Sequence, residues 1–88
     1  GLLELNGGTF SATAGITNNA GGEIHLMSTS STLAGGTISN SGLLTGTGRS
    51  LAALSNQSGG EVRVNANDDL RFLGAANSNA GRINLFNG

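Results

Sequence analysis

The stretch Asn18-Asn19-Ala20-Gly21-Gly22-Glu23-Ile24-His25-Leu26 returns 38 residues later as Asn56-Gln57-Ser58-Gly59-Gly60-Glu61-Val62-Arg63-Val64. Each copy joins a turn rich in Asn and Gly, which tolerate left-handed backbone angles, to an apolar-polar-apolar segment. Such alternation is typical of a short strand with one buried face. The pair therefore predicts a repeated unit, in which a tight corner is followed by a short strand.

Shorter copies of this unit extend the repeat along the chain. Asn40-Ser41-Gly42 precedes a weaker segment at Leu44, and Asn79-Ala80-Gly81-Arg82 precedes Ile83-Asn84-Leu85. With Leu3-Glu4-Leu5, the segments begin 21, 20, 18 and 21 residues apart, which gives a period of about 20 residues. We interpret the likeness of LNGGTFS at 5–11 to LAGGTIS at 33–39 as a further marker of the same register.

The period predicts the fold class. No helical spacing of apolar residues is present, and Gly is too frequent for long helices. An antiparallel sandwich of hairpins would use the same short strands, but it does not explain equivalent residues every 20 positions. We therefore expect an all-β parallel β-solenoid (β-helix) of about four coils, forming one segment over 1–88. The coils are predicted near 2–22, 23–42, 43–60 and 61–81, with a partial coil at 82–88.

Stacked coils would bury columns of equivalent apolar residues. The predicted first column is Leu3, Ile24, Leu44, Val62 and Ile83, and the second is Leu5, Leu26, Val64 and Leu85, with Gly46 as a gap. The predicted third column is Ile16, Ile38 and Leu54. Asn77 interrupts it, so we expect Ala76, Leu70 or Phe72 to fill the last coil.

The corner asparagines are expected to stack as well, because identical amides at strand spacing can form a hydrogen-bonded ladder. The predicted ladder is Asn18, Asn40, Asn56 and Asn79. Two outward columns follow from the same register, namely Glu4, His25, Thr45, Arg63 and Asn84, and beside it Glu23, Leu43, Glu61 and Arg82. We expect Glu61 to pair with Arg82, and Glu4 with His25, across coils.

Composition excludes several classes of function. Only 10% of the residues are charged and the net charge is −1, with no Lys, Trp or Tyr, which argues against binding to nucleic acid or to an anionic membrane. No apolar run is long enough to span a membrane, and the absence of Cys excludes disulfides and thiolate sites. A flexible Gly/Ser/Asn linker is disfavoured, because apolar residues make up 36% of the chain and recur in register.

The polar residues give no convincing active site. His25 has only Glu4 and Glu23 as plausible partners, and we interpret it as an exposed strand residue. Asp68 and Asp69, with Asn65 and Asn67, form a cluster of oxygen ligands that we interpret as a solvated loop. The segment 46–50 lacks the Lys and helix of a phosphate loop, so a turn between strands is expected there. We accordingly expect no catalytic residue, cofactor or metal, and no enzyme.

The repeat resembles a known class of proteins. Segments such as Thr37-Ile38-Ser39-Asn40-Ser41-Gly42 and Asn79-Ala80-Gly81-Arg82-Ile83 look like the repeats of bacterial haemagglutinin-type exoproteins and of autotransporter passenger regions. The resemblance covers essentially the whole chain. It implies a right-handed parallel β-helix, a bacterial origin, and an extracellular or cell-surface location.

These features favour a structural role over a chemical one. We expect a stalk, an adhesin segment or a self-stacking fibre subunit, and a segment of a longer repetitive protein or a processed product. The expected partners are flanking repeats or further copies stacked head to tail, because open sheet edges recruit other chains. The alternative is a module that binds a glycan or ice through one flat face, and a carboxylate-based enzyme ranks third.

Overall fold

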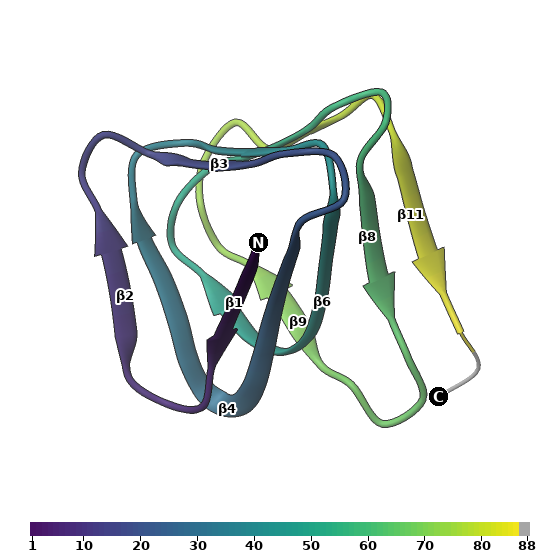
Figure 1. Ribbon diagram of the computed structural model, residues 1–88. Coiled ribbons are helices and arrows are strands. Elements are labelled where there is room, and N and C mark those ends of the chain that lie inside the picture. Colours follow the sequence, from purple (N-terminus) through teal and green to yellow (C-terminus); the bar gives the residue numbers. More distant parts are fainter. Residues whose placement is uncertain (87–88) are drawn as a thin grey trace.

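The corner-and-strand unit folds into three-sided coils that stack on one another (Figure 1). The computed structural model describes residues 1–86, and within them the chain forms strands and no helix. Because corners of Gly, Asn and Ser interrupt the apolar segments, most strands are short. The strands are β1 (Leu2–Leu5), β2 (Thr9–Ala12), β3 (Ile16–Asn18), β4 (Glu23–Gly35), β5 (Ile38–Asn40), β6 (Leu43–Ser50), β7 (Leu54–Asn56), β8 (Glu61–Val64), β9 (Leu70–Phe72), β10 (Ser78–Asn79) and β11 (Arg82–Leu85).

Each coil contributes one strand segment to each of three sides. The first side is formed by β1, the start of β4, the start of β6, β8 and β11, in that order. The second side contains β2, the ends of β4 and β6, and β9, and the third side contains β3, β5, β7 and β10. All pairings between coils are parallel, so the predicted parallel β-solenoid is confirmed, while its handedness stays a prediction.

The register of the first side matches the predicted columns. Leu3 pairs with Ile24, which pairs with Leu44. Leu44 in turn pairs with Val62, and Val62 with Ile83. The strands of this side begin at residues 2, 23, 43, 61 and 82, which are the first residues of the predicted coils. On the third side Ile16, Ile38 and Leu54 are paired as predicted.

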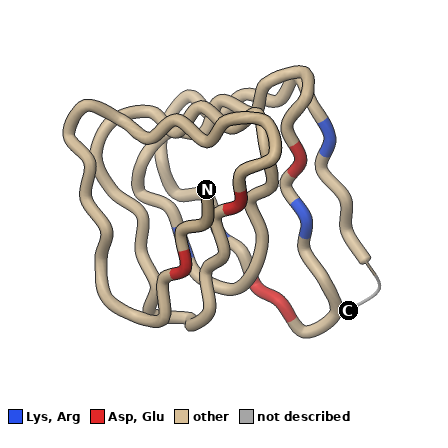
Figure 2. The backbone as a smooth tube through the Cα atoms, in the orientation of Figure 1, with Lys and Arg blue, Asp and Glu red and all other residues tan. Residues whose placement is uncertain are grey.

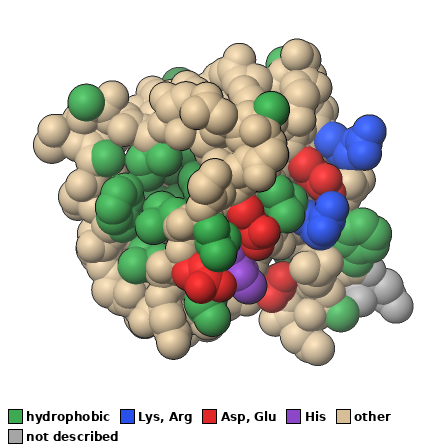
Figure 3. All heavy atoms as spheres, in the orientation of Figure 1, with side chains coloured by type: hydrophobic (Ala, Val, Ile, Leu, Met, Phe, Trp, Pro, Cys, Tyr) green, Lys and Arg blue, Asp and Glu red, His purple; other side chains and the backbone are tan. Residues whose placement is uncertain are grey.

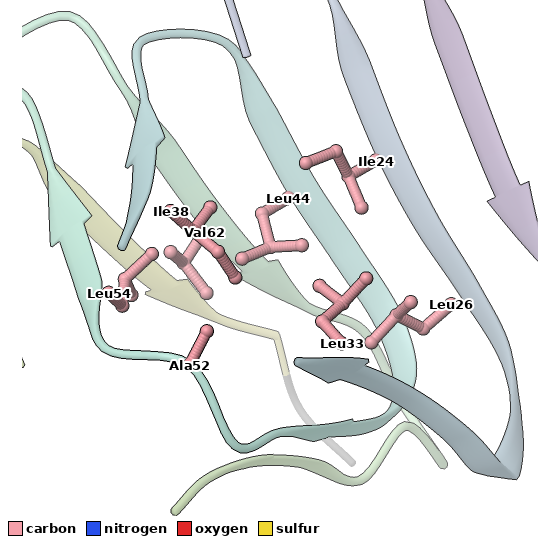
Figure 4. Close-up of a cluster of buried hydrophobic side chains, with 8 residues drawn as sticks. All are labelled: Ile24, Leu26, Leu33, Ile38, Leu44, Ala52, Leu54 and Val62. Carbon is pink, nitrogen blue, oxygen red and sulfur yellow. The ribbon is translucent and has the colours of Figure 1, made fainter. Parts of the chain in front are cut away.

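The core lies between the three sides (Figure 4). Inner members of the predicted columns are buried, as Ile24, Leu26 and Leu44 show. Leu33 and Ala52, which follow from no predicted column, complete the core from the second side and the next corner. The outermost members are not covered, since Ile83 is 50% exposed and Leu85 is 76% exposed. The core is therefore open at the last coil, and Figure 3 shows hydrophobic side chains gathered at the first coil, within the ring of β1, β2 and β3.

The corner between the first and second sides varies in length. Two predictions fail near it, namely the register marker at 5–11 and 33–39 and the turn at 46–50. Met27 pairs with Thr47 and Thr32 with Arg49, so β4 has the four extra residues 28–31 where β6 has Gly48 alone, and Ser31 among them is buried. The likeness of 5–11 to 33–39 does not mark the register, because Phe10 pairs with Leu33. The two Gly-Gly pairs simply serve different corners.

The segment 46–50, expected as a turn between strands, belongs to β6. It can continue as a strand because Gly46 lies against Leu26 of the previous coil, where a Cβ would come within 1.9 Å of the Leu26 carbonyl oxygen. The absence of a side chain lets the two backbones approach, with φ at +115°.

Candidate functional site

The corner asparagines form a continuous hydrogen-bonded ladder along the third side. Each lies at the end of its strand, and the register places Asn18, Asn40, Asn56 and Asn79 above one another. Nδ2 of each residue donates to Oδ1 of the next, at 2.8 Å, 2.9 Å and 2.8 Å. The predicted ladder is therefore present in every coil.

The first three ladder amides also satisfy backbone carbonyls at the corner. Nδ2 of Asn40 donates to the Gly42 carbonyl of its own coil at 3.2 Å and to the Glu61 carbonyl of the next coil at 3.1 Å. Asn18 and Asn56 repeat this pattern at equivalent positions. Asn40 and Asn56 are 0% and 1% exposed, so these bonds offset the cost of burying a polar group. The ladder therefore holds adjacent coils at one fixed register.

The ladder has a direction. The hydrogen bonds of residues 1–86 include none accepted by Oδ1 of Asn18 and none donated by Nδ2 of Asn79. The first coil therefore presents an amide acceptor and the last coil an amide donor, as a chain of parallel dipoles must.

An apolar recess of about 230 Å³ opens beside the last ladder residue. It is lined by Leu54, Phe72, Asn77, Ser78, Asn79 and Ile83. Asn77 follows Leu54 in the third column, but its Oδ1 accepts from Leu54 N at 2.8 Å and its Nδ2 donates to the Gly74 carbonyl at 3.0 Å. Leu70 and Phe72 pack against the core, as expected, whereas Ala76 is exposed with φ at +60° and fills nothing. The third column thus stays incomplete in the last full coil.

The outward residues of the first side carry most of the charge of the chain (Figure 2). The predicted neighbours Glu61 and Arg82 share a register, but the direct bonds of Glu61 go elsewhere. Arg63 Nε and Nη2 donate to its carboxylate at 2.9 Å and 3.1 Å, and Asn84 Nδ2 donates at 2.9 Å. Residues two apart on a strand point to the same side, which brings Arg63 within reach. Glu61 and Arg82 are therefore cross-coil neighbours, as expected, and the charge of Arg82 helps to lower the pKa of Glu61, but no salt bridge joins the two side chains within residues 1–86.

The hydrogen bonds of this cluster shift the pKa values of Glu61 and Arg63 in opposite directions. Hydrogen bonds from Arg63, and then from Asn84, hold the pKa of Glu61 below its ordinary value, while the bond to Glu61 raises the pKa of Arg63. The Arg63 guanidinium also lies 5.9 Å from the centre of the Phe86 ring. These contacts bind β8 to β11 on the outer surface.

His25 lies between two carboxylates at the surface. Its Nδ1 is 4.0 Å from Glu4 Oε2 and 3.9 Å from Glu23 Oε2, and all three side chains are solvent-accessible, as Figure 3 shows. The expected contact between His25 and Glu4 is therefore present, at the longest distance that counts as an ion pair, and Glu23 lies equally close. Within residues 1–86 no group of His, Cys, Asp or Glu is arranged to hold a metal.

The carboxylates near the corner of the fourth coil are engaged in the turn. Asp68 accepts from Thr47 Oγ1 and from Asn65 N, both at 3.1 Å. Asp69 pairs with Arg71 at 3.0 Å, and this bond lowers the pKa of Asp69. These contacts account for the cluster of oxygen ligands as a hydrogen-bonded loop.

A surface that the sequence analysis missed covers the third side. Thr17, Ser39, Ser55 and Ser78 are paired in register and point outward, so each coil adds one hydroxyl at about 4.8 Å from the next. No charged residue lies in the segments of this side at 14–20, 36–41, 52–58 and 75–80. The signal lay in the residue between each position of the predicted third column and its corner Asn.

Comparisons with known proteins add no relative. No helix within residues 1–86 is long and apolar enough to cross a membrane. No family model, curated protein or solved structure matches the chain.

Proposed function

We propose that the chain is an extracellular, non-catalytic structural element: a stalk, an adhesin segment or a self-stacking fibre subunit. The observation that carries the proposal is the continuity of its columns, because the ladder and the first core column run through every coil and end without a cover. Backbone and amide hydrogen bonds between all coils resist sliding and bending of the stack. The four coils measure 32 × 28 × 26 Å, and further coils stacked in the same register would extend them into a rod.

The spiral constrains how copies could join. The first side holds five strand segments, whereas the second and third sides hold four each. A copy placed with its β1 on β11 would continue the first column, with Leu3 over Ile83. It would leave one strand level empty on each of the other two sides. Direct head-to-tail stacking of copies therefore needs another segment to fill that level. Coils inserted within one chain leave no empty level, because each adds one strand segment to every side.

Coil duplication tests the rod. A second copy of 23–60, inserted after Gly60, adds two coils in register. It should lengthen the particle in small-angle scattering by about 10 Å, at about 4.8 Å per coil, and should raise the unfolding midpoint. Electron microscopy of the unaltered chain tests the fibre form separately, since dispersed 8.7 kDa particles would contradict it. An aggregated or unfolded duplication variant would contradict the structural proposal itself.

The third side supports a second candidate, a module that binds ice or a glycan. Its hydroxyl row is regular and uncharged, and it has no aromatic ring on which a sugar could stack, which favours ice. We expect inhibition of ice recrystallisation that is lost in a Ser39→Lys, Ser55→Lys variant and retained in Thr29→Lys, at the exposed corner between the first and second sides. Equal activity of the two variants would contradict this candidate.

A further inference from the structure

The third core column lacks a member just where the last full coil ends. Asn77 follows Leu54 in that column, but both ends of its carboxamide are bonded to backbone groups. The recess of about 230 Å³ therefore remains next to Leu54, with Phe72 and Ile83 in its wall. Ile83 is half exposed at this opening. An apolar side chain entering the recess would complete the column and exclude water from these residues.

A polar partner is missing beside the same recess. Nδ2 of each earlier ladder residue donates to Oδ1 of the next ladder residue and to carbonyls at the corner. The Oδ1 of Asn79 accepts from Asn56 at 2.8 Å and from Gly81 N at 3.1 Å, whereas no bond from its Nδ2 occurs within residues 1–86. The site therefore offers an amide donor next to an apolar hole.

The backbone supplies the third component. β10 is the last strand of the third-side sheet, and β9 pairs only with β6, so each has one open edge. Such an edge accepts an extended chain, which gains affinity from main-chain bonds and specificity from pockets for alternate side chains. The recess lies beside Asn77, and the free amide donor is at Asn79 of β10, two residues further along the chain. This spacing matches the positions of alternate side chains on an added strand.

The occupant must be a strand and not a whole second copy. If β3 of a copy were placed on β10, the preceding β1 of that copy would fall at the level that β11 already occupies. An extended segment that crosses only the second and third sides meets no such obstacle.

We propose that the opening formed by β9, β10 and β11 is an acceptor site for an extended strand with an apolar-Ser/Thr-Asn triplet, parallel to β10. The apolar side chain enters the recess between Phe72 and Ile83, and the Asn carboxamide accepts from Asn79 Nδ2. This inference rests on the proposed structural function and names the chemistry of its partner.

A peptide of residues 47–60 of the chain itself is the probe. It carries one second-side segment and the triplet Leu54-Ser55-Asn56, so it can fill both empty levels. We expect saturable binding by isothermal titration, with amide NMR shifts centred on β9 and β10. Peptides with Leu54→Asp or Asn56→Ala should bind at least tenfold more weakly, whereas a peptide with Gln57→Ala, at an outward position, should bind like the parent.

The protein variant Asn79→Asp provides the matched test. Its carboxylate still accepts from Asn56 and Gly81, so the fold is retained, but it cannot donate to the peptide. We expect at least tenfold weaker binding, with Asn19→Asp as the control outside the ladder. Absence of saturable binding, equal binding of the Leu54→Asp peptide, or shifts centred on β1 would overturn the proposal. The duplication experiment does not involve this site, so the two proposals can fail independently.

Discussion

Asn40 donates from Nδ2 to Oδ1 of Asn56 at 2.9 Å, with both side chains almost wholly buried. The bond joins two coils through side chains, in parallel with the backbone bonds of β5 and β7. The same amide closes the corner by bonding to carbonyls of two coils. One residue type therefore both sets the register between coils and satisfies the buried corner.

Replacing Asn40 by Asp should destabilise the fold strongly. A carboxylate can still accept from Asn18, but it loses the donations to the Asn56 amide and to two carbonyls, and it places charge in a buried site. We expect a loss of about 3 kcal/mol in the free energy of unfolding. Urea unfolding followed by circular dichroism measures it. Asn19→Asp, at the exposed neighbouring position, should change stability by less than about 0.5 kcal/mol; equal losses would show that the ladder contributes nothing specific.

Adding one methyl group at Gly46 should be nearly as costly. The new Cβ would lie 1.9 Å from the Leu26 carbonyl oxygen, so two coils would have to separate. We expect Gly46→Ala to lower the free energy of unfolding by about 3 kcal/mol. The control is Gly59→Ala, where the nearest atom is the Ser41 carbonyl oxygen at 3.9 Å and the expected change is within about 1 kcal/mol. A mild effect at Gly46 would mean that the coils are less tightly stacked than the structure shows.

The core column should respond to truncation according to its depth. Leu44 is fully buried between Ile24 and Val62, so Leu44→Ala removes contacts to two coils and leaves a cavity. We expect a loss of about 2–5 kcal/mol. Leu51 is exposed at a corner, and Leu51→Ala should cost less than about 1 kcal/mol. Thermal and urea unfolding of both variants would test the order, and a reversed order would contradict the assignment of the column.

The cluster of Glu61, Arg63 and Asn84 predicts a specific pH dependence. Because hydrogen bonds lower the pKa of Glu61 in the folded chain, its contribution is complete above the unfolded value near 4.5 and is lost as the pH falls through the folded value. The unfolding midpoint of the parent chain should therefore decrease on acidification below about pH 4.5 more than that of Glu61→Gln.

Arg63→Gln should reduce the same acid-side dependence, because Arg63 is the main cause of the lowered pKa. The double variant should show no further reduction beyond Glu61→Gln. Additive effects of the two changes would indicate that the residues act on stability independently, in conflict with their hydrogen bonds.

The sequence was most informative on the first and third sides. There, apolar residues alternate with polar ones and each strand adjoins an Asn corner, so Ile24, Leu44 and Val62 could be aligned without ambiguity. The second side gave no such signal. Its strands are rich in Thr, Ser and Gly, and the corner before it varies in length, so the pairing of Phe10 with Leu33 was missed.

Side-chain partners were harder to predict than strand register. Glu61 and Arg82 are register neighbours, as expected, yet Glu61 bonds to Arg63 within its own strand and to Asn84. A long Arg side chain can reach several carboxylates, and local packing decides between them. The row of Thr17, Ser39, Ser55 and Ser78 was missed for another reason, because the residue between each third-column residue and its corner Asn was not aligned as a column of its own.

The bulge at residues 28–31 has a consequence for how such chains diversify. Ser28 and Ser30 are in contact there at 3.0 Å, Ser31 is buried and donates to the Leu5 carbonyl of the first coil, and pairing with β6 resumes at Thr32. Length at this corner is therefore decoupled from the alignment of the coils. Foreign loops grafted between Thr29 and Ser30 would be displayed at a defined height on the rod. Substitutions at the exposed residues Thr29 and Ser30 can in the same way alter the outer surface of one coil without changing its strand pairing.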